Sequence, residues 1–446
     1  EGFIGSIIAY GACPFTDRSA SIMTKSSLLG HTIEAFTRFL QKSGLPADIT
    51  IRTYFRERKY LGSTDRRFIG DVYFGAIKQF ERLRSITADA LPTSDIQPQL
   101  IIAAYCLVFR DESPKELRNI ISGLPGNIAR NYPLGVFEKI VDRPYEENRL
   151  SVLPSAERMS IYYSFPLWFV THLELEYGAE TETLLKSLNE EAKTNLRVNR
   201  TLTTRDALQK ILSDAGLRTS ISSLAEDALI LEKRTNVWDL KAFKDGLFEI
   251  QDEASQLVAP FANINSNRIR ILDACSGAGG KTLHFSSLLR GSGEIVATDV
   301  DPYKLDELKK RSIRSNAQNI RIVKPDKYDQ YLGTKAFGSF NIVLLDVPCS
   351  GTGTLRRNPS IKWNLTSTMH DELIEKQRHI LERNAPYVKE GGVLLYSTCS
   401  LLKSEGEDQA NWFLSLHPEF TLEATRRTHP EQDHCDGFFV ARLRRK

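Results

Sequence analysis

The chain has 446 residues, enough for two or three domains, and 41% hydrophobic with 26% charged residues is typical of a globular protein. A net charge of +3 is compatible with a nucleic-acid partner but does not identify one. Six cysteines without a CxxC pair argue against a disulfide framework and a zinc site. No apolar run is long enough to span a membrane, so we expect a cytoplasmic protein. From the cysteine spacing we also expect no bound metal.

Residues 1–25 form the first predicted segment. The chain begins at Glu1, and its first methionine is Met23. We expect this segment to be a disordered or non-native extension. Residues 26–152 follow as a predicted all-α bundle, because apolar residues recur at helical spacing in 31–43 and no strand pattern of similar strength is present.

A cluster of basic residues interleaves with aromatic residues inside this bundle. One interpretation is a surface that faces RNA. The other is an ordinary solvated helix face on which arginines pack against tyrosine. The sequence leaves both open for Arg52, Arg56, Arg58, Lys59, Arg66 and Arg67.

Residues 153–245 are predicted to hold a helical linker and a small α+β module. Two amphipathic helices are expected at 168–177 and 180–193, followed by a short strand at 195–199 and a helix at 207–212. The module itself covers about residues 194–244.

In residues 246–446, from about residue 268 onward, the predicted elements alternate between strand, turn and helix. This alternation predicts a Rossmann-like α/β domain with a mostly parallel, doubly wound sheet. The expected strands are 269–274, 294–298, 320–323, 340–345 and 393–397.

A glycine-rich turn follows the first of these strands: Cys275, Ser276, Gly277, Ala278, Gly279, Gly280 and Lys281. It is not a P-loop, because Cys275 stands where that motif needs its first glycine. Glycines let the backbone approach a ligand, and Asp299 ends the next strand where an acid can bind two ribose hydroxyls. The GxGxxG spacing of NAD sites is absent, which favours S-adenosylmethionine as the cofactor.

Two cysteines stand at the ends of two predicted strands, Cys349 after Asp346-Val-Pro and Cys399 after Ser397-Thr. Cytosine C5 is a poor nucleophile until a thiolate adds at C6, and an acid that holds N3 protonated stabilises the adduct. Asp346 is a candidate for that acid. One cysteine is enough for attack, so the other needs a separate role such as assisting elimination. Spacing does not decide which is which.

These motifs together resemble the Nol–Nop–Sun family of RNA cytosine-C5 methyltransferases, over about residues 195–444. The helical half resembles that of the family's 16S ribosomal RNA branch, which carries an antitermination-factor-like RNA-binding domain. The motifs are Asp273-Ala-Cys-Ser-Gly-Ala-Gly-Gly-Lys281-Thr, Asp346-Val-Pro-Cys-Ser-Gly-Thr-Gly353, Arg356-Arg-Asn-Pro-Ser-Ile-Lys-Trp363, Ser397-Thr-Cys-Ser400 and Asp436-Gly-Phe-Phe-Val-Ala-Arg-Leu443.

The resemblance implies a role for each matching residue. Cys399 is the expected nucleophile and Cys349 the residue that assists product release. Residues 275–281 are expected to form the adenosylmethionine loop, with Asp299 on the ribose. Asp326 is expected near the adenine and Asp346 near both the methyl donor and the base.

The chain departs from the family pattern at two positions. Ala278 stands where the family commonly has proline, so we expect a more flexible loop. Pro325 replaces the usual glycine before Asp326, which leaves the part played by Asp326 open.

The expected function is methylation of cytosine C5 in RNA, with 16S ribosomal RNA as the partner and the chain acting as a monomer. Transfer RNA is the alternative substrate, and a non-catalytic RNA-binding assembly factor is the alternative class. A nucleotidase or dehydrogenase is disfavoured by the glycine-loop spacing. Basic clusters at 356–357, 426–427 and 442–446 are candidate phosphate contacts or plain surface charge, and Lys362-Trp363 is a candidate base-stacking pair or part of a core.

Overall fold

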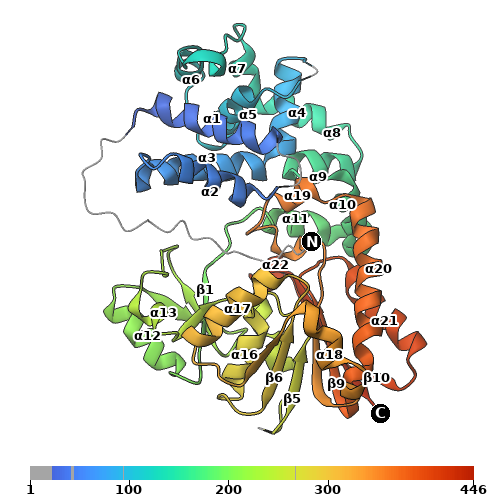
Figure 1. The fold of residues 1–446 in the computed structure, drawn as a ribbon. Coiled ribbons are helices and arrows are strands. Elements are labelled where there is room, and N and C mark those ends of the chain that lie inside the picture. Colours follow the sequence, from blue (N-terminus) through green and yellow to red (C-terminus); the bar gives the residue numbers. More distant parts are fainter. Residues whose placement is uncertain (1–22, 42–44, 94, 267) are drawn as a thin grey trace. The chain divides into compact units, whose positions relative to one another are not determined.

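The computed structural model describes residues 23–446 except 42–44, 94 and 267, so residues 1–22 of the predicted extension lie outside the described residues. The described chain divides into two compact units. One is helical and holds residues up to 189 together with 358–365, and the other holds 190–357 and 366–446 (Figure 1). No described helix is both long and apolar enough to cross a membrane.

The helical unit contains no strand among its described residues, which confirms the predicted all-α N-terminal region. Helix α5 is apolar on all sides and is buried, with residues 100–104 almost fully covered. Gly75 of α3 lets Tyr105 of α5 lie against the α3 backbone, where an added Cβ would meet the tyrosine oxygen at 2.0 Å. The helices are α1 (Lys25–Gln41), α2 (Ala47–Glu57), α3 (Ser63–Lys78), α4 (Phe80–Ala90), α5 (Pro98–Phe109), α6 (Pro114–Ser122), α7 (Val136–Ile140), α8 (Arg143–Ser151), α9 (Ser155–Tyr163), α10 (Leu167–Tyr177) and α11 (Thr181–Ser187).

The basic residues of α2, α3 and the turn between them fall into two groups, apart from Arg52, which pairs with Asp48. Arg58 lies 3.9 Å over the Tyr54 ring and forms a 2.7 Å ion pair with Glu34. Arg66 lies over the Phe55 ring and donates to a backbone carbonyl. For these two arginines the structure supports packing on aromatic residues. The side chains of Arg56, Lys59 and Arg67 are exposed.

Residues 358–365 lie inside the helical unit, although they follow the Cys349 loop in the sequence. Lys362, on the short helix α19 (Ile361–Asn364), is buried. Its ammonium donates to the carbonyls of Lys78 and Ser164 at 3.1 and 3.0 Å and to the side-chain oxygen of Asn189 at 2.8 Å. It therefore joins the carboxyl ends of α3, α9 and α11, where helix dipoles are negative.

Trp363 is a packing residue of the same segment. Its indole donates to the Ile77 carbonyl at 2.8 Å, and its ring meets Phe80 edge to face. Of the two interpretations of Lys362-Trp363, the structure supports the core.

The small α+β module is a four-stranded antiparallel sheet in the order β2-β3-β1-β4. The predicted strand at 195–199 is confirmed as β1, and Thr204 caps the predicted helix by accepting from the Ala207 N–H. The helix expected at 180–193 is shorter in the structure; beyond its end, Asn189 donates to the Tyr163 carbonyl and accepts from Lys362. The elements are β1 (Asn195–Val198), α12 (Arg205–Asp214), β2 (Thr219–Ile221), β3 (Ala228–Leu231), α13 (Lys241–Lys244) and β4 (Phe248–Ile250).

A seven-stranded sheet in the order β10-β11-β9-β8-β5-β6-β7 forms the C-terminal domain. Strands β5 to β9 are parallel, and β10 and β11 form an antiparallel edge, which confirms the mostly parallel, doubly wound sheet. The strands are β5 (Arg270–Asp273), β6 (Glu294–Thr298), β7 (Ile320–Val323), β8 (Phe340–Asp346), β9 (Val388–Thr398), β10 (Phe420–Thr428) and β11 (Phe438–Arg445).

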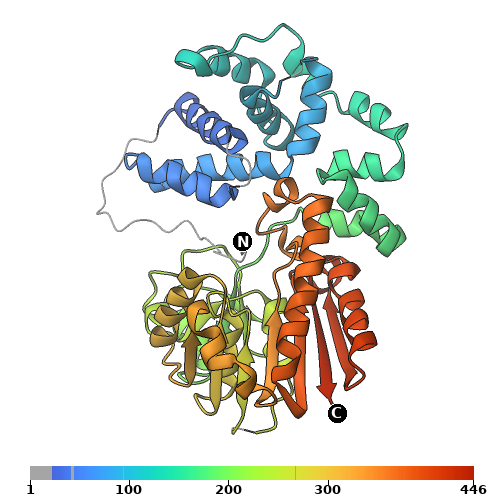
Figure 2. The same cartoon turned by 45° about the vertical axis from the view of Figure 1, so that its right-hand side comes forward.

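Helices cover both faces of this sheet. Alternate strand residues face opposite sides, so Ile271 and Ile342 pack with Phe285 of α16 on one face, while Leu272 and Val343 pack toward α20 and α21 on the other (Figure 2). The helices are α14 (Glu253–Gln256), α15 (Val258–Phe261), α16 (Gly280–Leu288), α17 (Pro302–Arg314), α18 (Tyr328–Leu332), α20 (Ser367–Asn384), α21 (Glu407–Leu416) and α22 (Pro430–Asp433).

The small module is joined to α16 by a buried histidine. His284 of α16 lies 3.2 Å from the carboxylate of Asp227, which also pairs with Arg200. Burial, followed by the charge of Arg197, lowers the pKa of His284 to about 4, and the hydrogen bond to Asp227 only partly opposes this. His284 is therefore neutral near neutral pH.

Replacing Lys362 with methionine should destabilise the helical unit by on the order of 3 kcal/mol, because oxygens that accept from the ammonium lose that donor inside the protein. Urea unfolding of the full chain, with hydrogen exchange to locate the change, measures the effect. Lys115→Met, on the exposed face of α6, is the matched control. Equal stability of the two variants would contradict this assignment.

Acid should destabilise the protein through His284. Its pKa of about 4 in the folded chain lies below the ordinary 6.5, so the unfolded chain binds this proton more readily. The stability is present above pH 6.5 and is lost toward pH 4, by on the order of 3 kcal/mol. His284→Gln should flatten the curve of unfolding free energy against pH in this window, whereas His379→Gln, on the exposed side of α20, should leave it unchanged.

Candidate active site

The site lies where the strand order reverses. From β5 the chain builds the sheet through β6 and β7, and then returns to place β8 on the other side of β5. Asp273 ends β5 and Asp346 ends β8, so both carboxylates stand at the carboxyl edge of two neighbouring parallel strands. Ligands of doubly wound sheets bind at this kind of switch point.

The glycine turn between β5 and α16 follows the predicted path. Gly277 and Gly279 have φ of +53° and +89°, values that favour glycine. A Cβ on Gly279 would meet Leu308 of α17 at 2.1 Å, whereas one on Gly277 would meet nothing within 4 Å. The turn is therefore packed tightly on one side and open on the other. The open side leaves the backbone accessible to a ligand.

Asp299 follows β6 as predicted and faces the turn. Its carboxylate accepts from the Gly277 N–H at 2.8 Å and from the Asp301 N–H at 2.9 Å. Asp326 lies just after β7, in the short 3₁₀ segment Pro325–Lys327, and is exposed. The structure thus brings Asp299 to the glycine turn but gives Asp326 no contact with it.

Asp346 pairs with the last residue of the glycine turn. The Lys281 ammonium lies 2.6 Å from one carboxylate oxygen of Asp346, and the Ser397 hydroxyl donates to the other at 3.1 Å. Lys281 also lies 4.8 Å from the centre of the Phe438 ring. Asp273, one strand away, is fully buried, and burial raises its pKa to about 7 despite a hydrogen bond from Thr282.

The two predicted cysteines meet. The sulfur of Cys349 lies 3.3 Å from that of Cys399, although 50 residues separate them in the sequence. The contact with Cys399, followed by burial, raises the pKa of Cys349 well above its usual range, so Cys349 keeps its proton. The pair combines a potential nucleophile with a neighbouring protonated thiol that can donate a proton.

A buried hydroxyl cluster beside the cysteines was missed by the sequence reasoning. Ser350 and Ser400, each next to a cysteine, lie 3.1 Å apart and both contact Thr352. The buried carboxylate of Glu405 accepts from the Ser350 N–H at 2.8 Å and from Gln377 at 3.0 Å. The signal in the sequence is the serine that follows each cysteine. The cluster joins the two cysteine loops directly.

Both interpretations of the Arg356–Arg357 cluster, phosphate contacts or surface charge, are wrong. Arg356 is buried and Arg357 is half-buried; both form ion pairs with Asp436, and Arg357 also pairs with Asp252. In the other basic clusters, Arg427 pairs with Glu407, and Arg442 and Arg444 pair with Glu423. Arg426 remains exposed.

Models of known protein families match the C-terminal domain and a region that includes most of the small α+β module. A model described as 16S rRNA methyltransferase RsmB/F matches residues 262–444. A second model, described as the ferredoxin-like domain of RsmF/B-like methyltransferases, matches residues 165–238. The matched ranges include the glycine turn, both cysteines and most of the small module.

Relatives extend the similarity over most of the chain. A Synechocystis protein described as probable ribosomal RNA small subunit methyltransferase B is 30% identical over 419 residues, covering 86% of this chain and 92% of the relative. Ribosomal RNA small subunit methyltransferase B of Citrobacter koseri is 32% identical, covering 68% and 72%. The solved structure of the protein PH0851 superposes with a TM-score of 0.75 at 26% identity, covering 95% of this chain and 99% of its own. The chain therefore belongs to the RsmB/F family of rRNA methyltransferases, as its motifs predicted.

Proposed function

We propose that this protein methylates C5 of cytosine in RNA, using S-adenosylmethionine, through a covalent adduct between Cys399 and C6 of the base. The observation that carries the proposal is the 3.3 Å contact between the sulfurs of Cys349 and Cys399. Cys349 follows β8, the strand that ends at Asp346, and Cys399 directly follows β9. Thiol chemistry at a pyrimidine needs a nucleophile, a proton carrier and an acid in this proximity.

The residues of the glycine turn fit adenosylmethionine. Gly277 offers an open stretch of backbone, and Asp299 provides carboxylate oxygens for hydroxyl groups. Val300, directly after Asp299, is 80% exposed and offers an apolar surface to an adenine ring. When bound, this cofactor supplies an electrophilic methyl group. We propose Cys275, Ser276, Gly277, Ala278, Gly279, Gly280 and Lys281 as the loop that holds it, with Asp299, Asp326 and Asp346 around it.

The chain's own residues carry the chemistry at the base. The Cys399 thiolate bonds to C6 and opens the C5–C6 double bond, which makes C5 nucleophilic. Asp346 holds the proton at N3 that stabilises the adduct, and Lys281 fixes the position of its carboxylate. After methylation a base takes the proton from C5, the C5–C6 double bond re-forms, and the C6–S bond breaks with its electron pair returning to the Cys399 sulfur. Cys349 assists this elimination from 3.3 Å away.

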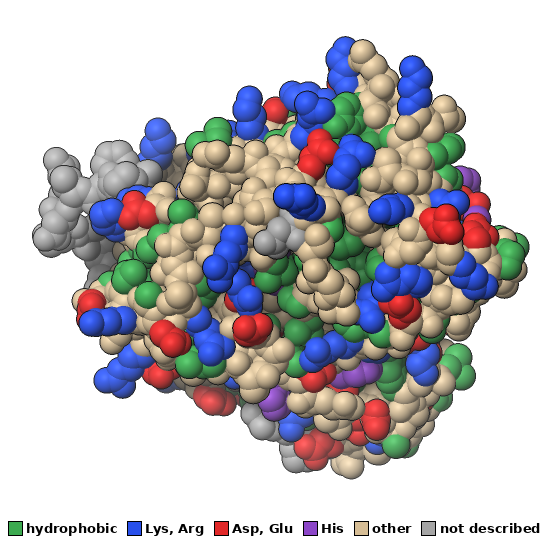
Figure 3. All heavy atoms as spheres, turned by 90° about the horizontal axis from the view of Figure 1, so that it is seen from below, with side chains coloured by type: hydrophobic (Ala, Val, Ile, Leu, Met, Phe, Trp, Pro, Cys, Tyr) green, Lys and Arg blue, Asp and Glu red, His purple; other side chains and the backbone are tan. Residues whose placement is uncertain are grey.

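We propose 16S ribosomal RNA as the substrate, because the similar proteins are named as methyltransferases of the ribosomal small subunit. Exposed cations in the helical unit at Arg56, Lys59 and Arg67, with the 64% exposed Tyr60, are available to contact RNA. The face drawn in Figure 3 shows lysines and arginines interspersed with acidic residues, without one dominant basic patch. RNA shape, rather than a continuous cationic track on that face, is the expected basis of recognition.

Transfer RNA remains the second candidate substrate. Methylation of unmodified 16S rRNA and of deacylated tRNA transcripts with tritiated adenosylmethionine separates the two. An enzyme that binds adenosylmethionine yet forms 5-methylcytidine in neither RNA would support the non-catalytic assembly factor instead.

The division of labour between the cysteines predicts a trapped complex. Cys349→Ala should accumulate protein joined covalently to RNA, because the adduct forms but its release is impaired. The adduct should be visible by denaturing electrophoresis and mass spectrometry. Adding Cys399→Ala should abolish it.

Cys106→Ala, a buried cysteine of the helical unit, is the matched control and should trap nothing. A Cys349→Ala protein that methylates RNA without trapping would contradict the proposed division. Trapping by Cys399→Ala instead would mean that the two roles are exchanged.

The small module and α17 together clamp the proposed cofactor loop through charges that are buried or half-buried. Arg197 of β1 donates to the Gly280 carbonyl at 2.5 Å, and Arg311 of α17 donates to the Ala278 carbonyl at 2.7 Å. Glu249 of β4 lies opposite Arg197 in the sheet and pairs with Arg311 and Arg314. Burial opposes the charge of Glu249, but the arginines outweigh it and lower the pKa of this carboxyl group.

Glu249→Gln should weaken adenosylmethionine binding about tenfold, because the arginines lose the charge that holds them against the turn. Calorimetric titration of the full chain with adenosylmethionine and with adenosylhomocysteine measures this without RNA. Glu232→Gln, exposed in the same module, is the control. Equal affinity in both variants would show that the clamp does not shape the cofactor loop.

A further inference from the structure

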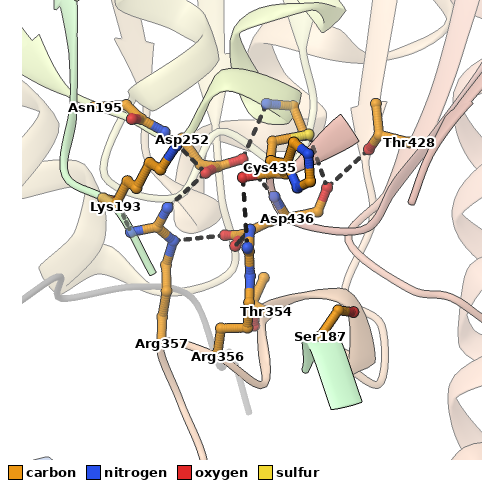
Figure 4. A network of polar contacts seen from close by, with 12 residues as sticks. Ser187, Lys193, Asn195, Asp252, Thr354, Arg356, Arg357, Thr428, Cys435 and Asp436 are labelled. Carbon is orange, nitrogen blue, oxygen red and sulfur yellow. Dashed lines mark hydrogen bonds and ion pairs between the residues drawn. The ribbon is translucent and has the colours of Figure 1, made fainter. Parts of the chain in front are cut away.

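Four charged side chains, three of them buried and Arg357 half-buried, form a compact network beside the proposed active site (Figure 4). Arg357 donates from Nε to Asp436 at 2.6 Å and from Nη2 to Asp252 at 2.5 Å, and its Nη1 donates to the Lys193 carbonyl at 2.9 Å. Arg356 reaches the second oxygen of Asp436 at 3.2 Å. Two cations therefore face two carboxylates, and the charges balance.

The network joins segments that are distant in the sequence. Asp252 caps α14 by accepting from the Ala254 N–H, and it also accepts from Asn195 of β1. The Asp436 N–H in turn donates to Asp252 at 3.1 Å. The Cys349 loop, the turn before β11 and the small module thus meet at the Arg357 guanidinium. Burial opposes its charge, but Asp436 and Asp252 outweigh this and raise the pKa of Arg357.

A backbone relay leads from this network to Cys399. Gly437, next to Asp436, donates its N–H to the Gly353 carbonyl at 2.9 Å, and Gly353 donates its N–H to the Cys399 carbonyl at 2.9 Å. The two glycines touch backbone to backbone, since a Cβ on Gly353 would lie 1.9 Å from the Gly437 oxygen. No side chain lies between them to absorb a displacement. A shift of Asp436 is therefore transmitted to the backbone of Cys399.

We propose that Asp436 and Arg357 are positioning residues, which hold the Cys399 backbone and the Cys349 loop at the separation that the cysteine chemistry needs. This inference rests on the proposed function and deepens it. Neither side chain has to touch the RNA or the cofactor. Each acts through the Gly437–Gly353 relay and through the loop that carries Cys349.

The energetics favour a positioning role over a purely stabilising one. A buried ion pair has to overcome the desolvation of both charges, and apolar replacements are often as stable. What such a network supplies is fixed direction, because the Arg357 guanidinium makes three hydrogen bonds in one plane. Displacing reacting groups by about 1 Å can lower a rate about 100-fold.

Asp436→Asn is the most informative variant, because it removes the negative charge and keeps the size of the side chain. An asparagine can accept from only one of the two arginines through its oxygen, and its amide N–H then opposes an arginine N–H. Arg357→Lys keeps the charge but cannot donate along three fixed directions. We expect a milder effect from Arg357→Lys than from Asp436→Asn.

The first readout needs neither RNA nor cofactor. Diamide oxidises the two thiols to a disulfide, taking up their two electrons and two protons at its nitrogen–nitrogen double bond. The rate of Cys349–Cys399 bond formation, followed by peptide mapping, reports how closely the sulfurs are held. We expect Asp436→Asn to slow it about tenfold relative to the wild-type chain, with an intermediate rate for Arg357→Lys.

The second readout is methylation of unmodified 16S rRNA. Asp436→Asn should lower kcat about 100-fold while KM for adenosylmethionine stays within about twofold. Glu146→Gln is the control for general destabilisation, because it removes the buried negative charge that pairs with Arg82 in the helical unit. It should change neither the disulfide rate nor kcat once the proteins are compared at temperatures equally far below their melting points.

Wild-type rates in Asp436→Asn and Arg357→Lys would overturn the inference. So would equal losses in Asp436→Asn and Glu146→Gln, which would reduce the network to a stabilising role. If Asp436→Asn does not fold, Arg357→Lys decides by the same two readouts. A wild-type chain that methylates no RNA would contradict the proposed function, while the disulfide rates would still test the positioning.

Discussion

Parallel pairing between β8 and β9 is the constraint on which the proposed site depends. The register places Asp346 opposite Ser397, so Cys349 and Cys399 follow from the same edge of the sheet a few residues later. β8 and residues 392–398 of β9 are largely buried on both faces, and a slip by one residue would exchange the faces of every side chain. The packing of these two strands in the hydrophobic core therefore fixes where the two sulfur atoms lie.

At the carboxyl edge of the sheet, the proposed reacting groups are oriented by hydrogen bonds and ion pairs from other protein groups. Lys281 holds Asp346, the hydroxyls of Ser350 and Ser400 join the cysteine loops, and Glu405 accepts from the backbone of one of them. Each contact has a fixed direction in a region of low dielectric constant, where a misplaced charge is costly. Groups held in this way need little reorganisation during a reaction.

The segment after Cys349 contributes residues to two separate networks of polar contacts. Arg356 and Arg357 belong to the buried network beside the cysteines, and Lys362, five residues later, is the shared hydrogen-bond donor at three helix ends in the helical unit. The chain thus passes from one unit into the other and back between Arg357 and Thr366. The RRNPSIKW motif is one continuous sequence, but its residues stabilise two separate folding units.

The helical region, the small module and the parallel sheet could be predicted from the sequence, because periodicity of apolar residues is a local property. The sequence also identified Cys349, Cys399, Asp346 and the glycine turn as features at strand ends, and the structure places all of them at one edge. The roles of these residues remain predictions.

Which charged residues are buried or enclosed in ion pairs depends on the packed chain. Arg357 and Lys362 look like surface cations in the sequence, because nothing local reveals that Asp436, Asp252 or the carbonyls of distant helices surround them. The same holds for Glu405, whose donors come from residues 28 and 55 positions away. Burial is a property of the packed chain, and the partner that makes a buried charge tolerable is set by the fold rather than by neighbours in the sequence.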